Sequence, residues 1–429
     1  MADYQSNLTK KKFEFIRTDF SVFRKQTLTR TVNTAVRGLP YHYLRSSHRS
    51  KASSTSTRLP AGKMEIQINS GGEKSKRRFE EFDVAKAIGI LLVVIGHNIP
   101  TGSLHEFIYS FHMTLFLVVS GLVIKHESLM NLKTIRETVF MNQKALAYFL
   151  FYSIIYILFD LVVRVLWLKS ESFHLIFWDV YQTLTFFGIS VLWFISALFL
   201  AKVLASRILA SEFRLSINIL IIMLTLVGVG AVNYIMPSHI GMSGLKLVGY
   251  YPVIAITRTL LMASFLMMGY LLRPIIFRFL IMSKSYVGAV LCSSLLLVNV
   301  LFSPYTGTVD YHYLLLGNAP VTLMLGLTGS IGVLGCSSLI VRASLGSKAF
   351  VFLGKNSLFV MVTHEYFLLS GTGAVLIHWL HLSLTLTETY FFRISVLLVI
   401  EILLIWMFSS KIELLIIKLT NRISTLHTQ

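Results

Sequence analysis

Lys86 and His97 carry the first chemically suggestive pattern in this sequence. They are separated by ten residues in an otherwise apolar stretch, residues 82–98, which reads FDVAKAIGILLVVIGHN. A neutral imidazole accepts protons near neutral pH, since its ordinary pKa is about 6.5, and an ammonium group attracts phosphates. Because ionisable groups are costly in an apolar helix, both residues are site candidates. The structural alternative is that Lys86 reaches the membrane surface and His97 is a hydrogen-bonded interior histidine.

The spacing of this pair predicts a specific chemistry. On a helix, Lys86 and His97 lie about 16 Å apart along the axis, a length close to the reach of a pantetheine arm. A cation at one end can hold the phosphates of a cytosolic coenzyme while the imidazole at the other end meets its acyl thioester. The pattern therefore indicates acyl transfer, with His97 as the base that takes a proton from an acceptor hydroxyl.

Two pairs of opposite charges have helical spacing. Asp83 lies one turn before Lys86 and is predicted to orient it, although a surface ion pair explains the same spacing. Asp160 and Arg164 are four residues apart in another apolar stretch, and we expect them to neutralise each other; a substrate-binding role is the alternative.

A second group of polar residues lies in later or neighbouring apolar segments. His364 and Glu365 fall near the middle of an apolar run, so they are expected to face a cavity, Lys86 or an imidazole; a buried hydrogen-bonded pair is the alternative. His112 is a candidate second site histidine or a helix-packing residue. Trp193 is expected to wall the acyl pocket or to belong to an interfacial aromatic belt.

The composition indicates a polytopic membrane protein. Of 429 residues, 55% are hydrophobic and 14% charged, and the mean hydropathy is +0.69. The net charge of +19 suggests nucleic acid, but residues 1–78 hold 17 Lys and Arg against 5 Asp and Glu, a net charge of +12. The basicity thus belongs largely to a tail, and no nucleic-acid partner is expected. Neither the two cysteines nor the histidine spacings predict a metal site.

Ten apolar segments predict the elements that position these residues, and the fold class is therefore all-α with about ten transmembrane helices. Lys and Arg gather in alternate connections, which places both termini in the cytoplasm. We expect a basic, disordered tail at 1–79, or a translation start at Met64, then a membrane domain at 80–420 and a tail at 421–429. The predicted spans are 84–99, 105–124, 146–168, 191–210, 215–235, 257–280, 286–303, 314–341, 350–379 and 391–417.

Four motifs in this order resemble the acyltransferase-3 family of integral membrane acyltransferases, which includes O-acetylases of bacterial surface polysaccharides. The first is the basic residue, ten positions and a histidine, with Lys86 where Arg is common. The others, as they stand here, are Phe111-His112-Met113 with Leu115, Phe116, Ser120 and Gly121; Leu192-Trp193-Phe194 with Ala197 and Leu198; and Gly354 with Ser357, Leu358 and His364.

The resemblance implies site roles and substrates. His97 would be catalytic, with Glu365 and His364 beside it, and the donor would be acetyl-CoA, held by Lys86, Lys144 and Trp193. The acceptor would be a hydroxyl of a polysaccharide or lipid-linked glycan at the cell (inner) membrane, and polysaccharide assembly proteins would be partners. No permanently bound cofactor is expected.

Other interpretations remain open. The acyl group is succinyl instead of acetyl, or the acceptor is an amine; an acyl-enzyme through His97 or Ser120 is a further variant. A different class, a proton-coupled secondary transporter of a solute or lipid-linked sugar, also uses intramembrane His, Glu and Arg. The sequence shows no related halves of the kind that many transporters have, which favours the enzyme.

Overall fold

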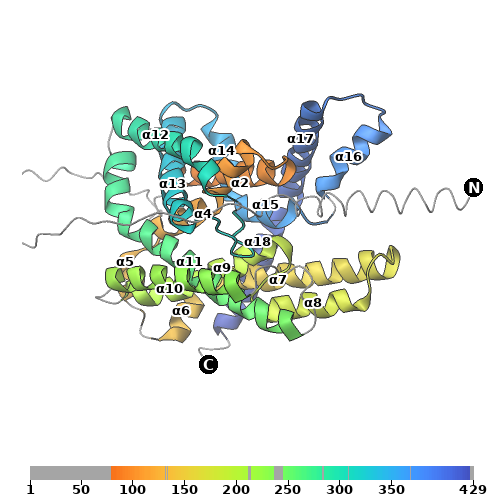
Figure 1. The fold of residues 1–429 in the computed structure, drawn as a ribbon, viewed down its shortest axis with the longest axis horizontal. Coiled ribbons are helices and arrows are strands. Elements are labelled where there is room, and N and C mark those ends of the chain that lie inside the picture. Colours follow the sequence, from red (N-terminus) through yellow and green to blue (C-terminus); the bar gives the residue numbers. More distant parts are fainter. Residues whose placement is uncertain are drawn as a thin grey trace, which may run out of the picture. The chain divides into compact units, whose positions relative to one another are not determined.

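The computed structural model describes residues 79–130, 132, 134–210, 214–235, 245–282, 285–307, 309–367 and 369–425. Within these ranges the chain is helical, and its one β-type pairing is a bridge between Asp310 and Leu315 (Figure 1). The predicted all-α fold class is thus confirmed. Apart from Phe79, the predicted tail at 1–79 lies outside the described residues.

The helices follow one another with short connections, and three of them continue into π-helical turns: η2 (Asp160–Trp167), η4 (Phe277–Met282) and η6 (Ile405–Ser409). The α-helices are α2 (Glu80–Asn98), α3 (Ser103–Tyr109), α4 (His112–Leu122), α5 (His126–Met130), α6 (Ile135–Met141), α7 (Gln143–Phe159), α8 (Phe173–Leu184), α9 (Trp193–Leu209), α10 (Arg214–Ile235), α11 (Leu245–Ile276), α12 (Tyr286–Phe302), α13 (Ala319–Arg342), α14 (Ser347–Lys355), α15 (Ser357–Thr363), α16 (Leu369–Trp379), α17 (Leu386–Leu404) and α18 (Ser410–Thr425).

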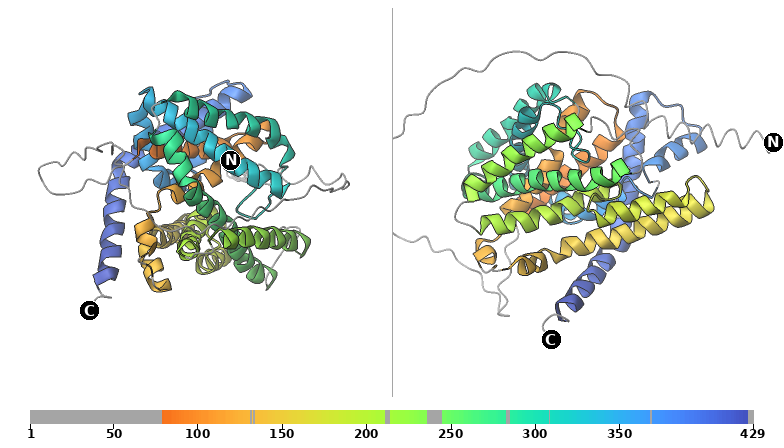
Figure 2. Two further views of the ribbon diagram at one scale, coloured as in Figure 1. Left: turned by 90° about the vertical axis from the view of Figure 1, so that its left-hand side faces the viewer. Right: turned by 60° about the horizontal axis from the view of Figure 1, so that its bottom comes forward.

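Helix α2 lies at the centre of the described domain. Acidic residues in its first turn favour a helix start, and Pro100 follows shortly after its end. It packs against α4, α13, α14 and α15, and Figure 1 shows these helices gathered around it. Figure 2 shows α9, α10 and α11 side by side, from yellow-green to green. Helix α2 is therefore enclosed by protein over much of its length.

The predicted span at 105–124 is wrong as a single helix. It is divided into α3 and α4 at Ser110 and Phe111, where the backbone φ of Phe111 is −146°. Side chains bind the carbonyls near the break: Ser110 donates to Phe107 at 2.8 Å, and His112 donates through Nδ1 to Ile108 at 2.8 Å. The break is stable because these local hydrogen bonds compete with the helical pattern.

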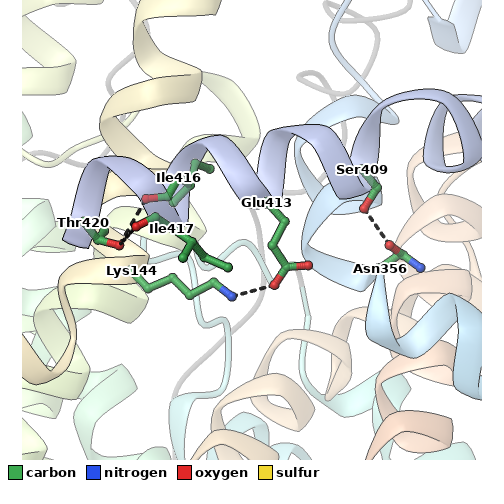
Figure 3. Close-up of polar contacts among 7 residues, drawn as sticks. All are labelled: Lys144, Asn356, Ser409, Glu413, Ile416, Ile417 and Thr420. Atoms are coloured by element: carbon green, nitrogen blue, oxygen red, sulfur yellow. Dashed lines mark hydrogen bonds and ion pairs between the residues drawn. The ribbon is translucent and has the colours of Figure 1, made fainter. Parts of the chain in front are cut away.

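The predicted span at 350–379 is also wrong as a single helix, since it forms α14, α15 and α16. At the first break, Asn356 donates to the Phe352 carbonyl at 2.8 Å and accepts from Ser409 at 2.6 Å, as the close-up in Figure 3 shows for the second bond. The second break follows Thr363. Consequently, His364 and Glu365 lie at the end of a short helix instead of the middle of a long one.

Six helical segments are long and apolar enough to cross a membrane: Ile135–Trp167, Ser190–Leu209, Val248–Ile281, Tyr286–Tyr305, Ala319–Arg342 and Leu386–Asn421. Apolar side chains on their surfaces are strongly exposed, such as Leu291 (64%) and Leu297 (64%) of α12. Such surfaces suit lipid contact. The described residues thus support a multi-pass membrane protein with six candidate spans, and a count of ten is not confirmed.

The close approach of α14 to α2 gives a first prediction. A Cβ added at Gly354 would collide with the Asp83 backbone carbonyl, whereas one added at Gly371 meets nothing within 4 Å. We expect Gly354→Ala to destabilise the solubilised protein by about 1–3 kcal/mol, because well-packed backbones cannot separate freely. The measurement is the thermal unfolding midpoint in detergent.

Gly371→Ala is the matched control and should leave that midpoint nearly unchanged. An equal effect of the two substitutions would contradict the packing of α14 on α2.

Candidate functional site

The last turn of α2 brings His97 to two residues that are distant in sequence. Its Nδ1 lies 3.7 Å from Oε2 of Glu365, and its ring centroid lies 5.3 Å from that of His364. The His97 side chain is 31% exposed and that of Glu365 is 27% exposed, so a substrate can reach both. The structure thus brings the three residues predicted to be catalytic into one cluster.

His364 is buried, and its environment fixes its tautomer. Nδ1 lies 2.9 Å from the Val360 carbonyl, which only accepts, so Nδ1 carries the proton. Nε2 then holds a lone pair, and this buried atom has no hydrogen-bond partner among the described residues. His364 is therefore arranged to accept a hydrogen bond rather than to donate one.

Among the described residues, His97, His364 and Glu365 form a group that could hold a metal ion. Their ligand atoms lie within 4.8 Å of one another. Bonds of about 2.0–2.1 Å in a tetrahedral zinc site place ligand atoms about 3.3 Å apart, and Nδ1 of His97 and Oε2 of Glu365 are 3.7 Å apart. We therefore interpret the cluster as a Glu365–His97 pair with the His364 imidazole beside it. That the site works without a metal stays a prediction.

Three further rings, those of Tyr109, His105 and His112, pack near His97. Of these residues, the sequence predicts a role for His112 alone. Tyr109 has its ring centroid 6.2 Å from that of His97, and His105 stacks on Tyr109 at 3.9 Å. His112 contacts the other side of Tyr109 at 4.8 Å but is buried and bonded to the Ile108 carbonyl. His112 thus packs against Tyr109, which in turn lies next to His97.

Asp310 also belongs to this region and was missed. It lies between α12 and α13, and its Oδ1 accepts from the His312 N–H at 2.8 Å. Burial raises the pKa of its carboxyl, while the N–H groups of His312 and Tyr313 and the charges of His97 and Arg258 oppose the rise. A lone acidic residue in a connection without other charges was the available sequence signal.

Arg258 fixes the connections around this region. It is fully buried in α11, and its guanidinium donates to the carbonyls of Phe187 at 2.7 Å, His312 at 3.0 Å and Phe186 at 3.3 Å. It also lies 5.1 Å from the centroid of Trp193. The sequence predicts no role for this residue, although an arginine in an apolar span was a usable signal.

Trp193, predicted to bind the coenzyme, belongs to the cluster around Arg258. Its ring is parallel to that of His312 at 5.6 Å. It is half-buried at the first residue of α9, nine positions before Lys202. The structure therefore groups Trp193 with the connections that precede α9 and α13, and no described contact joins it to Lys86 or Lys144.

The two lysines predicted to bind the coenzyme each have a carboxylate partner. Nζ of Lys86 lies 2.7 Å from Oδ1 of Asp83, whose side chain is 4% exposed. Nζ of Lys144 lies 2.7 Å from Oε1 of Glu413 on α18, and Figure 3 shows this exposed pair. Asp83 thus orients Lys86 across one helical turn, as its spacing predicts.

In the described part of the chain, none of the remaining predicted residues forms an ion pair or hydrogen bond with His97. Nε of Arg164 lies 3.0 Å from Oδ1 of the buried Asp160, so these residues neutralise each other. Asp160 also accepts from Tyr366, one residue after Glu365. Ser120 is half-buried on α4 and makes no described contact with the His97 cluster. An acyl-enzyme through Ser120 therefore has no structural support among the described residues.

Comparison with known proteins agrees with this architecture. The family model described as an acyltransferase domain, Acyl_transf_3, matches residues 79–409, which include α2, α15 and every residue of the His97 cluster. No curated protein and no solved structure matches the chain. Because the match covers most of the chain, this multi-pass helical membrane protein belongs to the acyltransferase-3 family and is an acyltransferase.

Proposed function

We propose that this protein transfers an acetyl group from cytosolic acetyl-CoA to a hydroxyl of an extracytoplasmic or lipid-linked polysaccharide. The main supporting observation is that α2 carries different chemical groups at its two ends. A lysine held by a buried carboxylate lies near its start, and an imidazole beside a carboxylate lies near its end. A charged coenzyme and a neutral thioester need these two environments, about 16 Å apart.

The reaction balances with the groups at the second end. His97 takes the acceptor hydroxyl proton on Nε2, because its Nδ1 faces Glu365. The hydroxyl oxygen attacks the thioester carbonyl carbon, the carbon–sulfur bond breaks, and the imidazolium returns the proton to the departing thiolate. Glu365 stabilises the imidazolium in between, and Nε2 of His364 accepts a hydrogen bond that orients the acceptor.

The proposed membrane arrangement matches this chemistry. The chain crosses the inner membrane ten times with both termini in the cytoplasm, and Lys86 and Lys144 face the cytosolic coenzyme. The divided helices α3–α4 and α14–α16 act as broken crossings, which membrane proteins tolerate where the backbone is buried in protein. Polysaccharide assembly proteins deliver the acceptor at the other face.

The principal test replaces the proposed base. We expect His97→Ala to abolish ester-linked acetate on surface glycans, because no other described imidazole with an unbonded nitrogen is as accessible at the cluster. Cells making wild-type or variant protein are compared by the acetate that mild alkali releases from purified glycans.

His378→Ala is the matched control, since His378 is exposed on α16 and outside the cluster. Both variants must reach wild-type abundance in the membrane. Undiminished acetate with His97→Ala would refute the mechanism.

Glu365 gives a second test of the same geometry. Glu365→Gln removes the charge that stabilises the imidazolium but keeps the size of the side chain. We expect kcat to fall about tenfold to a hundredfold, with little change in the KM for acetyl-CoA. Glu171→Gln, an exposed carboxylate in the connection before α8, is the control and should retain full activity. An unchanged kcat in Glu365→Gln would remove Glu365 from the mechanism.

Chelation tests whether the cluster works without a metal. Because His97 and Glu365 already form a base and a charge partner that need no metal, we expect EDTA or 1,10-phenanthroline to leave acetyl transfer in isolated membranes unchanged. A loss that added zinc restores would instead assign His97, His364 and Glu365 as metal ligands.

A further inference from the structure

A cavity of about 250 Å³ opens between the start of α5 and the last turns of α11. Its walls are His126, Tyr270, Leu271, Arg273 and Pro274. A proline inside a helix removes one backbone hydrogen bond and favours a bend, which explains an opening at this turn of α11. The cavity thus combines a cation, an imidazole and a phenol, and none of the three belongs to the His97 cluster.

Arg273 carries a positive charge whose direction its neighbours fix. Nη1 donates to the Ile124 carbonyl at 2.5 Å, and the guanidinium carbon lies 5.1 Å from the centroid of the Phe277 ring. The side chain is half-buried, and no described carboxylate forms an ion pair with it. A guanidinium has five N–H groups, so further donors remain beside the cavity. A partly desolvated cation of this kind favours an anion as its partner.

His126 and Tyr270 supply a second donor in the same wall. Nδ1 of His126 lies 2.7 Å from the Tyr270 hydroxyl, so one of these groups donates to the other. A neutral imidazole and a phenol together have one N–H and one O–H, and their mutual bond uses one of them. If the hydroxyl donates, the Nε2–H of His126 is left; if Nδ1 donates, the hydroxyl proton is left. The pair therefore keeps one donor in either tautomer.

The surroundings favour an anion that carries apolar chains. The cavity lies on α11 within Val248–Ile281, a segment long and apolar enough to cross a membrane. Exposed apolar side chains follow directly along α11 and η4, namely Ile275 (52%) and Phe279 (52%), and Val123 before the Ile124 carbonyl is 54% exposed. Acyl chains cover such side chains favourably, whereas a soluble nucleotide leaves them uncovered.

We propose that this cavity binds the phosphate group of a membrane phospholipid. Arg273 is its charged ligand, the His126–Tyr270 pair is its second donor, and the acyl chains lie along the exposed apolar side chains. This site goes beyond the proposed function, because it serves neither the acyl donor nor the acceptor. The phosphates of a soluble coenzyme have the same chemistry, and the test distinguishes them.

The bound lipid also stabilises the packing of α11 on the start of α2. Phe277, which lies under the Arg273 guanidinium, has its ring centroid 4.9 Å from that of Phe79 and 5.7 Å from that of Phe82. A ligand that binds the folded protein alone raises its stability with ligand concentration. Phosphatidylglycerol should therefore raise the thermal unfolding midpoint of the purified protein.

The test measures the dissociation constant of short-chain phosphatidylglycerol for the purified full-length protein in detergent by native mass spectrometry. Arg273→Gln should weaken this binding about tenfold, because a charge-assisted hydrogen bond is lost. Arg273→Lys should restore part of the affinity, since it keeps the charge. The rise of the unfolding midpoint with added lipid should shrink in Arg273→Gln by the same order.

A second variant leaves the bond between Arg273 and Ile124 in place. His126→Phe combined with Tyr270→Phe removes both donors of the pair and keeps two aromatic rings, so it should weaken lipid binding about threefold without lowering the midpoint of the lipid-free protein. The matched control is Arg278→Gln, because Arg278 is exposed on η4 and outside the walls of the cavity. It should change the affinity less than twofold.

Two further ligands identify the source of the phosphate. Dioctanoylglycerol, which has acyl chains and no phosphate, should bind all variants equally, and the dissociation constant of coenzyme A should not change in Arg273→Gln. A weakening of coenzyme A binding as large as that of the lipid would overturn the proposal, as would equal effects of Arg273→Gln and Arg278→Gln. Neither measurement requires acetyl transfer, so the result is independent of the proposed function.

Discussion

The structure depends on one constraint, that charge inside a membrane domain must be compensated. Asp83 compensates Lys86, and Asp160 compensates Arg164 through a direct ion pair. Arg258 uses another solution, since its guanidinium is surrounded by backbone carbonyls and aromatic faces. The His97 cluster leaves one polar atom unsatisfied, because Nε2 of His364 is buried and has no hydrogen-bond partner among the described residues. This incomplete compensation is what a substrate site requires.

The helix breaks determine where the polar residues of the site lie. A continuous helix over 350–379 would carry His364 and Glu365 along one straight axis. The break at Asn356 and the end of α15 after Thr363 instead bring both residues to the last turn of α2. The break between α3 and α4 similarly places Tyr109 beside His97, with His112 packed behind it. Side chains that bind backbone carbonyls hold both breaks, so positioning the site and breaking the helices have one physical cause.

Local sequence patterns predicted the local parts of this arrangement. Asp83 with Lys86 and Asp160 with Arg164 follow helical spacing, and the apolar runs predicted the all-α class. The contact of His97 with Glu365 joins segments far apart in the chain, so no spacing rule predicts it. The family motifs grouped His97 with His364, and Glu365 was a candidate because a carboxylate in an apolar run must face a cavity or a partner. The helix breaks were missed because apolar residues resume directly after Ser110 and after the short polar stretch Lys355-Asn356-Ser357, so that each region reads as one span. Asp310 and Arg258 each stood out as a charged residue among uncharged neighbours, but their hydrogen-bond partners are backbone groups, which no side-chain spacing indicates.

In the proposed mechanism both ends of the reaction belong to α2, and the rigidity of this helix gives a physical reason for that arrangement. If the donor site and the base were on separate helices, any tilt between them would change the distance from phosphate to thioester. On one helix that distance is set by the rise per residue, about 1.5 Å, and is independent of the breaks in its neighbours. Neighbouring groups complete each end: the segment after α15 brings Glu365 to His97, and Asp83 pairs with Lys86. In the proposed mechanism, α2 therefore fixes the distance that the donor must span, and the acceptor is recognised by residues of other segments.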